Sequence, residues 1–117
     1  MDWIWLVVAL AVAWYLWQRR SLISAEDATR LMAEGADLVD VRSPDEYRGD
    51  HVKGAVNLPS DQVEREAGAQ LPDRQRPVLL YCLSGTRSAM AARTLKRLGY
   101  EQVHNLGSLS RARQAIS

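Results

Sequence analysis

The chain has 117 residues and a mass of 13.1 kDa, which is enough for one compact domain and too little for two. Fifteen basic and 14 acidic side chains leave a net charge of +1. The chain therefore lacks the broad positive surface of nucleic-acid-binding proteins, and we expect no nucleic-acid partner. A single cysteine excludes an internal disulfide and a multi-cysteine zinc site, and we expect no metal and no cofactor.

The chain begins with an apolar run. Residues 3–17 are all apolar or aromatic, and as a helix they would extend roughly 22 Å, against a hydrocarbon core of ~30 Å. Trp and Tyr rings gather at both ends, as they do at the two headgroup levels of a bilayer. The run therefore predicts a single-pass transmembrane anchor over residues 1–20, which makes the membrane a partner through residues 3–17 and leaves residues 21–117 as the folded domain.

The flanking charges predict the orientation of this anchor. Asp2 precedes the run, and Arg19 and Arg20 follow it. Positive residues favour the cytoplasmic side, so we expect the N-terminus outside and the domain in the cytoplasm, at the inner membrane if the chain is bacterial. A cleaved signal peptide and a buried helix are the alternatives. The first usually starts with a basic region, and the second needs a larger core than about a hundred residues supply.

The rest of the chain alternates helices with short strands. Ser24 and Ser43 are typical helix caps, Pro44 suits a first helical turn, and Gly35 suits the position after a helix. The expected elements, in chain order, are a helix over 24–34, a strand over 38–41, a helix over 43–49, a strand over 55–58, a helix over 61–68, a strand over 78–81, a helix over 88–98, a strand over 103–106 and a helix over 108–116. Strands separated by helices predict an α/β fold, a small parallel sheet with helices on both faces.

Cys82 lies where reactive chemistry is expected. It follows the strand over 78–81 directly and precedes a tight loop that opens a helix. The N–H groups of such a loop and the helix dipole form a cradle for an anion. They and Arg87 are expected to lower the pKa of the thiol, while Gly85 lets the backbone turn close to the sulfur. An ionised thiol needs no separate general base, so Cys82 is predicted to be a nucleophile rather than a passive core residue.

The loop Cys-Leu-Ser-Gly-Thr-Arg-Ser, residues 82–88, resembles the active-site loop of single-domain rhodaneses, the thiosulfate sulfurtransferases. Three other stretches agree with the same family pattern, and the resemblance covers about residues 21–110. These stretches are Leu38-Val39-Asp40-Val41-Arg42, the run from Glu46-Tyr47 through Gly49, His51, Val52, Gly54-Ala55 to Asn57-Leu58-Pro59, and the segment Leu98-Gly99-Tyr100 with Val103 and Leu106-Gly107.

The resemblance implies a rhodanese-like fold and a sulfurtransferase activity. Cys82 would take a sulfane sulfur from a small donor such as thiosulfate and become a persulfide, which cyanide, a cellular thiol or a protein acceptor then removes. The substrate-binding residues implied are Leu83, Ser84, Gly85, Thr86 and Arg87. Asp40, Arg42 and Ser88 are candidates for supporting the loop, although Asp40 and Arg42 fit a purely structural ion pair equally well.

Three alternatives remain open. Dual-specificity phosphatases share this fold, but their Arg lies six positions after the Cys, whereas Arg87 lies five positions after Cys82, so the loop is better sized for a sulfur atom. A membrane-tethered persulfide carrier and a non-catalytic interaction module of the same shape are the others.

Two positions depart from the family pattern. Leu83 stands where Arg is frequent, and Gly107-Ser108-Leu109 stands where Gly-Gly followed by Trp is usual. The first departure removes a positive charge where an anionic donor would enter, and it predicts weak use of thiosulfate.

Overall fold

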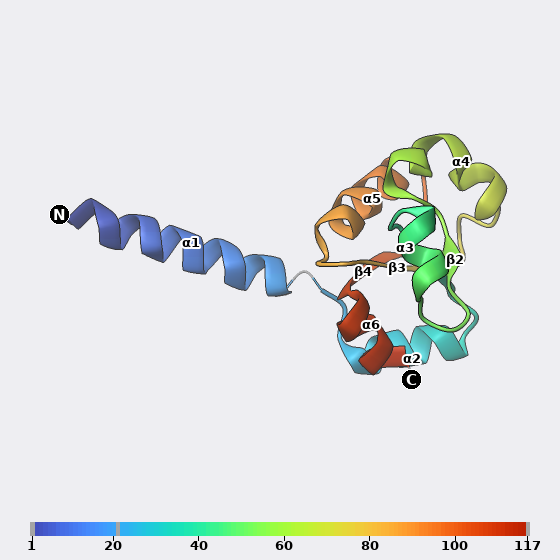
Figure 1. Ribbon diagram of the computed structural model, residues 1–117, viewed down its shortest axis with the longest axis horizontal. Helices are drawn as coiled ribbons and strands as arrows, with labels where there is room; N and C mark the ends of the chain where they lie inside the picture. Colours follow the sequence, from blue (N-terminus) through green and yellow to red (C-terminus); the bar gives the residue numbers. More distant parts are fainter. Residues whose placement is uncertain (1, 21, 117) are drawn as a thin grey trace.

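The computed structural model describes residues 2–20 and 22–116. A helix, α1 (Asp2–Arg20), projects away from an α/β domain (Figure 1). The boundary expected between residues 20 and 21 stays a prediction, since residue 21 lies outside the described residues. The domain consists, in chain order, of α2 (Ala25–Ala33), β1 (Asp37–Asp40), α3 (Pro44–Gly49), β2 (Val56–Asn57), a 3₁₀ turn (Ser60–Gln62), α4 (Val63–Gln70), β3 (Val78–Cys82), α5 (Thr86–Arg97), β4 (Val103–Ser108) and α6 (Leu109–Ile116).

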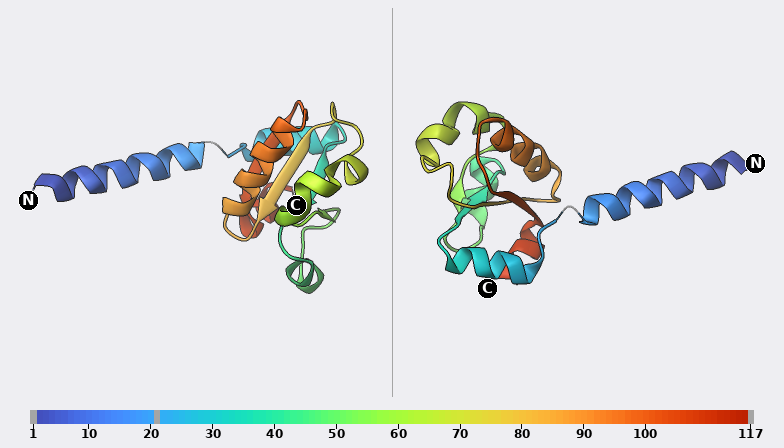
Figure 2. Two further views of the ribbon diagram at one scale, coloured as in Figure 1. Left: turned by 90° about the horizontal axis from the view of Figure 1, so that it is seen from above. Right: turned by 180° about the vertical axis from the view of Figure 1, so that it is seen from behind.

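The four strands form one parallel sheet in the order β2-β1-β3-β4. Helices α4 and α5 cover one face of this sheet, and α2 and α6 cover the other (Figures 1 and 2). The expected α/β fold with a small parallel sheet is therefore confirmed. Because all strands run the same way, their carboxyl ends and the loops that follow them share one edge, where α/β proteins bind ligands.

The alternation of side chains along β3 decides which way the cysteine faces. Val78, Leu80 and Cys82 pack into the core beneath α4 and α5, whereas Leu79 and Tyr81 pack into the core beneath α2 and α6. Successive side chains of a strand point to opposite faces, and all five are buried. Cys82, the last residue of β3, therefore lies on the α5 side of the sheet.

The expected elements of the domain are present, with boundaries shifted by one or two residues. One shift matters for the site. Helix α5 begins at Thr86 rather than Ser88, because Gly85 takes a left-handed conformation and serves as its N-cap. Arg87 and Ser88 therefore belong to the first turn of a helix and not to a loop.

The expected transmembrane anchor over residues 3–17 is wrong. Among the described residues, no helix combines the length and the apolar character that crossing a membrane requires. Helix α1 has 19 residues, but Asp2 begins it and Gln18, Arg19 and Arg20 end it. Nothing in the structure tests the cytoplasmic location expected for the domain, which stays a prediction.

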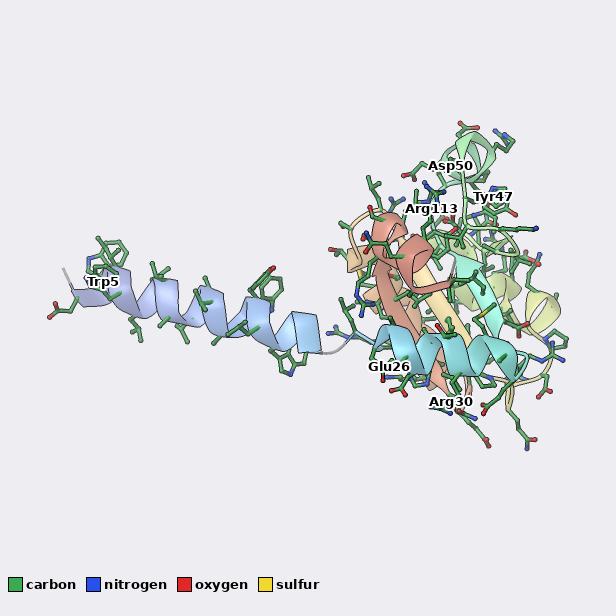
Figure 3. The ribbon with its side chains drawn as sticks, turned by 90° about the horizontal axis from the view of Figure 1, so that it is seen from below. Trp5, Glu26, Arg30, Tyr47, Asp50 and Arg113 are labelled. Carbon is green, nitrogen blue, oxygen red and sulfur yellow. The ribbon has the colours of Figure 1, made fainter. Side chains whose placement is uncertain are left out.

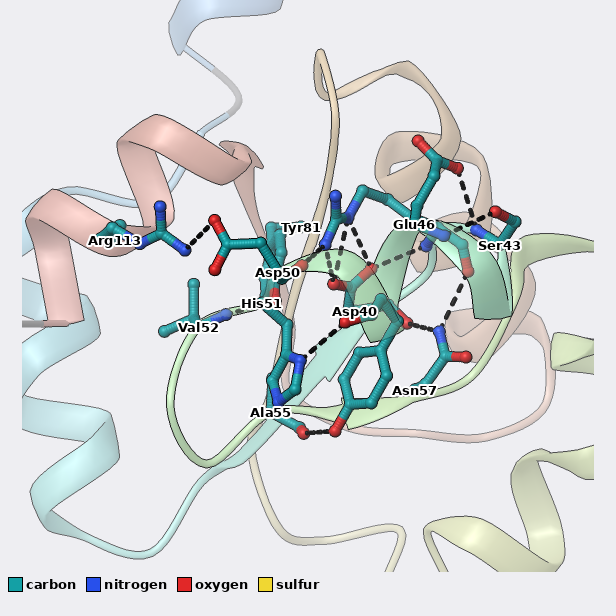
Figure 4. A network of polar contacts seen from close by, with 12 residues as sticks. Asp40, Ser43, Glu46, Asp50, His51, Val52, Ala55, Asn57, Tyr81 and Arg113 are labelled. Atoms are coloured by element: carbon teal, nitrogen blue, oxygen red, sulfur yellow. Dashed lines mark hydrogen bonds and ion pairs between the residues drawn. The ribbon is translucent and has the colours of Figure 1, made fainter.

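A buried ion pair ties the segment after α3 to the sheet. Asp40 and Arg42 have side chains only 0% and 5% exposed, and Arg42 Nη2 lies 2.8 Å from Asp40 Oδ2. The same Arg42 nitrogen donates to the carbonyl oxygen of Asp50. On β3, the Tyr81 hydroxyl accepts the Val52 N–H at 3.0 Å (Figure 4). These contacts join the connection between α3 and β2 to strands β1 and β3.

Removing one partner of this pair is expected to destabilise the domain. Arg42→Ala leaves the Asp40 carboxylate buried without its countercharge, and we expect the free energy of unfolding to fall by about 3–5 kcal/mol in urea denaturation. Arg48→Ala is the control, because Arg48 pairs with Asp45 on the exposed surface of α3 and such pairs contribute about 1 kcal/mol or less. A loss for Arg42→Ala no larger than for the control would contradict a structural role.

Candidate active site

The sulfur of Cys82 lies at the carboxyl end of β3, fully buried. The Gly85 N–H donates a hydrogen bond to it at 2.9 Å, and the Ser88 hydroxyl lies 3.5 Å away. Helix α5 begins at Thr86, so the positive end of the helix dipole adds to these donors. Gly85 and Ser88 thus contact the sulfur directly.

Two glycines allow the loop to close on the sulfur. Gly85 has φ +101° and Gly107 has φ +92°, a region that L side chains rarely adopt. A Cβ on Gly85 would lie 3.3 Å from the Gly107 Cα. The loop after β3 therefore packs backbone to backbone on the end of β4, and this contact turns the Gly85 N–H toward Cys82.

The side chain of Asn105, in β4, is hydrogen-bonded to the loop that follows β3. Its Oδ1 accepts the Gly107 N–H at 2.9 Å and lies 2.7 Å from the Ser88 hydroxyl, while its Nδ2 donates to the Gly85 carbonyl at 3.2 Å. The side chain is buried, and its Oδ1 and Nδ2 both have hydrogen-bond partners, as buried polar atoms usually do. No motif in the sequence indicates a role for Asn105. The one local signal is an amide between Val103 and Leu106, two residues expected to be buried.

The surroundings of Cys82 favour its thiolate. Burial alone raises the pKa of the thiol, because it penalises the charged form. Hydrogen bonds from the Ser88 hydroxyl and from the N–H groups of Ser88, Gly85 and Ser84 act in the opposite direction and outweigh it. The net effect is a pKa below the usual value of a thiol, which is what a nucleophilic cysteine requires.

The main partner of Arg87 is Glu46, an acidic residue that the sequence indicates only as part of the family pattern. Arg87 Nη1 and Nη2 lie 2.7 and 3.1 Å from the two carboxylate oxygens of Glu46. Glu46 also completes a capping box with Ser43 at the start of α3. The hydrogen bond from Arg87, followed by the one from the Ser43 backbone, lowers the pKa of Glu46 to about 2, so the pair stays ionised at neutral pH. Cys82 also raises the pKa of Arg87, but less than Glu46 does.

The side chains of the remaining predicted residues are exposed or make their contacts away from the sulfur. Leu83, Ser84 and Thr86 are exposed, Leu83 to 60%. The side chains of Asp40 and Arg42 form hydrogen bonds with each other, and Arg42 also bonds to the segment after α3. The two residues therefore act as a structural pair. In the part of the chain that the structure describes, no cluster of His, Cys, Asp and Glu is suited to a metal ion.

The hydroxyl of Ser88 provides a direct test of this arrangement. Ser88→Ala is expected to raise the pKa of Cys82, because a hydrogen bond that favours the thiolate is lost. The measurement is the pH dependence of iodoacetamide alkylation, which reports Cys82 alone because the chain has one cysteine. Ser84→Ala, which keeps the backbone N–H and changes an exposed side chain, is the control. Coincident pH profiles for Ser88→Ala and wild type would contradict the assignment.

Comparisons with known proteins agree with this geometry. The family model of the rhodanese-like domain matches residues 24–111. Thiosulfate sulfurtransferase PspE of Escherichia coli is 38% identical over 71 residues, covering 61% of this chain and 68% of that protein. The uncharacterized protein YqhL of Bacillus subtilis is 36% identical over 96 residues, covering 81% of this chain and 75% of that protein.

Among solved structures, the human single-domain sulfurtransferase TSTD1 superposes with a TM-score of 0.69 at 25% identity, covering 83% of this chain and 98% of that one. The residues 24–111 that match the family model include every residue placed around Cys82. The chain belongs to the family of rhodanese-like domains.

Proposed function

We propose that the chain is a sulfurtransferase that takes a sulfane sulfur from a donor such as thiosulfate onto Cys82 and passes it to a thiophilic acceptor. The observation that carries the proposal is the buried Cys82 sulfur, which accepts the Gly85 N–H at 2.9 Å in front of the N-terminus of α5. That PspE, a relative, is named a thiosulfate sulfurtransferase supports the choice of donor.

The first half-reaction loads the cysteine. The Cys82 thiolate attacks the outer sulfur of thiosulfate, the S–S bond of the donor breaks, and its electron pair leaves with sulfite. A persulfide remains on Cys82, with its negative charge on the terminal sulfur. The N–H groups of the loop that lower the pKa of Cys82 are suited to stabilise this charge, because fixed donors in a buried site need no reorganisation.

The second half-reaction removes the transferred sulfur from Cys82. Cyanide or a thiolate attacks the terminal sulfur, the S–S bond of the persulfide breaks, and the Cys82 thiolate returns. The products are thiocyanate or a new persulfide, and the two displacements imply ping-pong kinetics. The chain has one cysteine, so no internal thiol can accept the sulfur. The acceptor therefore comes from outside, whether as a small molecule or as a protein that receives sulfur from a carrier.

The ion pair of Arg87 supports sulfur transfer over the phosphatase alternative. A phosphatase of this fold needs its loop arginine to bind the phosphate oxygens. Arg87 instead donates to both carboxylate oxygens of Glu46. The low pKa of Cys82 likewise favours a reactive site over a non-catalytic interaction module.

Replacing the cysteine is the primary test. Cys82→Ser is expected to abolish thiocyanate formation from thiosulfate and cyanide, because a hydroxyl of far higher pKa replaces the thiolate. Intact mass after incubation with thiosulfate should show the gain of one sulfur atom on wild type and none on the variant. Thermal unfolding of the variant should be nearly unchanged, since the volume change is small. Thiocyanate formation that survives in Cys82→Ser, or phosphatase activity without sulfur transfer, would contradict the proposal.

A positive charge at the rim should improve the use of thiosulfate. Leu83→Arg is expected to lower the KM for thiosulfate by up to about fivefold at low salt, because a cation on the residue that follows Cys82 attracts a dianion. The effect is no larger because solvent screens this attraction. Met90→Arg is the matched control, since Met90 is exposed to 63% on the next turn of α5. An equal effect of both changes would show that net charge, rather than position at the rim, is responsible.

A further inference from the structure

The charges around Cys82 are arranged in pairs. Arg87 is the one charged residue between Cys82 and Ser88, and Glu46 binds it through two hydrogen bonds of 2.7 and 3.1 Å. Arg42, the neighbouring arginine beyond the end of β1, is matched by Asp40 at 2.8 Å. The arginine nearest to the sulfur in sequence is therefore largely neutralised by its carboxylate partner, and the residue next to Cys82 in the chain, Leu83, is apolar and exposed.

We propose that Glu46 is a specificity-determining residue: by neutralising Arg87 it disfavours sulfur donors of high negative charge and favours donors with a single charge and an apolar body. This inference rests on the proposed function, because it concerns the donor that loads Cys82. Both partners are partly buried, with side chains 37% and 31% exposed, so solvent screens the pair less than it screens a pair on the open surface. The exposed Leu83 side chain offers the apolar contact at the rim.

The charge of residue 46 can be removed while the helix cap that it completes is kept. Glu46 is the N3 residue of the capping box of α3, where Ser43 accepts its N–H and its carboxylate accepts the Ser43 N–H. Glutamine serves this position as well as glutamate does. Glu46→Gln therefore removes one negative charge beside Arg87 and keeps both the cap and an acceptor for the guanidinium.

An activity-independent measurement comes first. The only cysteine in the chain is Cys82, so alkylation by iodoacetate, an anion, and by iodoacetamide, its neutral analogue, reports the potential at this sulfur. Both reagents react with the thiolate, so a change in the ionised fraction of Cys82 alters both rates equally. The ratio of the iodoacetate rate to the iodoacetamide rate is therefore independent of that fraction. We expect this ratio to rise between about threefold and tenfold in Glu46→Gln at low salt, and the rise to shrink as salt is added.

Donor kinetics form the second measurement. Thiosulfate and benzenethiosulfonate lose sulfur through the same S–S cleavage, to sulfite and to benzenesulfinate, but they carry two negative charges and one. In Glu46→Gln we expect the KM for thiosulfate to fall by about threefold to tenfold, the KM for benzenethiosulfonate to fall less, and kcat to change little. Asp45→Asn is the matched control, with the same loss of charge one residue away on a side chain that is 88% exposed. Both readouts should stay unchanged in this control.

The outcomes separate this inference from the proposed function. An alkylation ratio equal to that of wild type, or a fall in kcat for both donors alike with unchanged KM, would mean that Glu46 only positions Arg87, and the inference is overturned. If wild type forms no persulfide with either donor, the proposed function fails, while the alkylation ratio still tests the electrostatic role of Glu46. A ratio that rises equally in Asp45→Asn would assign the effect to net charge and also overturn the inference.

Discussion

The close approach of two backbone segments is the constraint on which the site depends. The Gly85 Cβ position faces the Gly107 Cα at 3.3 Å, and both glycines have positive φ. Any side chain at Gly85 would therefore push the loop away from β4 and carry its N–H away from the Cys82 sulfur, which it now reaches at 2.9 Å. Asn105 fixes the same contact by bonding the Gly85 carbonyl and the Gly107 N–H, so a neutral amide in the middle of β4 sets the geometry around the Cys82 sulfur.

This construction stabilises a thiolate with dipoles instead of a countercharge. Desolvation opposes ionisation of Cys82, and hydrogen bonds from Ser88, Gly85 and Ser84 outweigh it. Arg87, the obvious countercharge, gives its two strongest contacts to Glu46. Donors fixed in this way would also suit the terminal sulfur of a persulfide, whose charge lies one atom further out.

The sequence predicts the fold of the domain well and the environment of the cysteine only in part. Helix caps such as Ser43 and stop residues such as Gly35 are local signals, so elements and their order follow from the sequence, and the strand-loop-helix pattern identifies Cys82. The apolar run over residues 3–17 predicts an anchor by its continuity alone, whereas α1 as a whole, with Asp2 at one end and residues 18–20 at the other, lacks the length and apolar character that crossing a membrane requires. The partners of Arg87 and Ser88 come from α3 and β4, distant segments whose contacts depend on the packing of the sheet and which no local pattern specifies.

Helix α3 shows how polar contacts position a short surface helix beside the site. It has six residues, none of them fully buried, and only Tyr47 packs partly buried against the core beneath α2 and α6, so burial of apolar surface accounts for only part of its position. Two arginines hold it from different elements: Arg87 of α5 binds Glu46 in its first turn, and Arg42 binds the carbonyl of Asp50 just past its last. On the same side of the domain, Asp50 lies beside Arg113 of α6 (Figure 3). Because α3 is fixed by charged contacts, its placement and the potential at Cys82 are coupled: the carboxylate of Glu46 that anchors the helix is also the group that neutralises the arginine beside the sulfur.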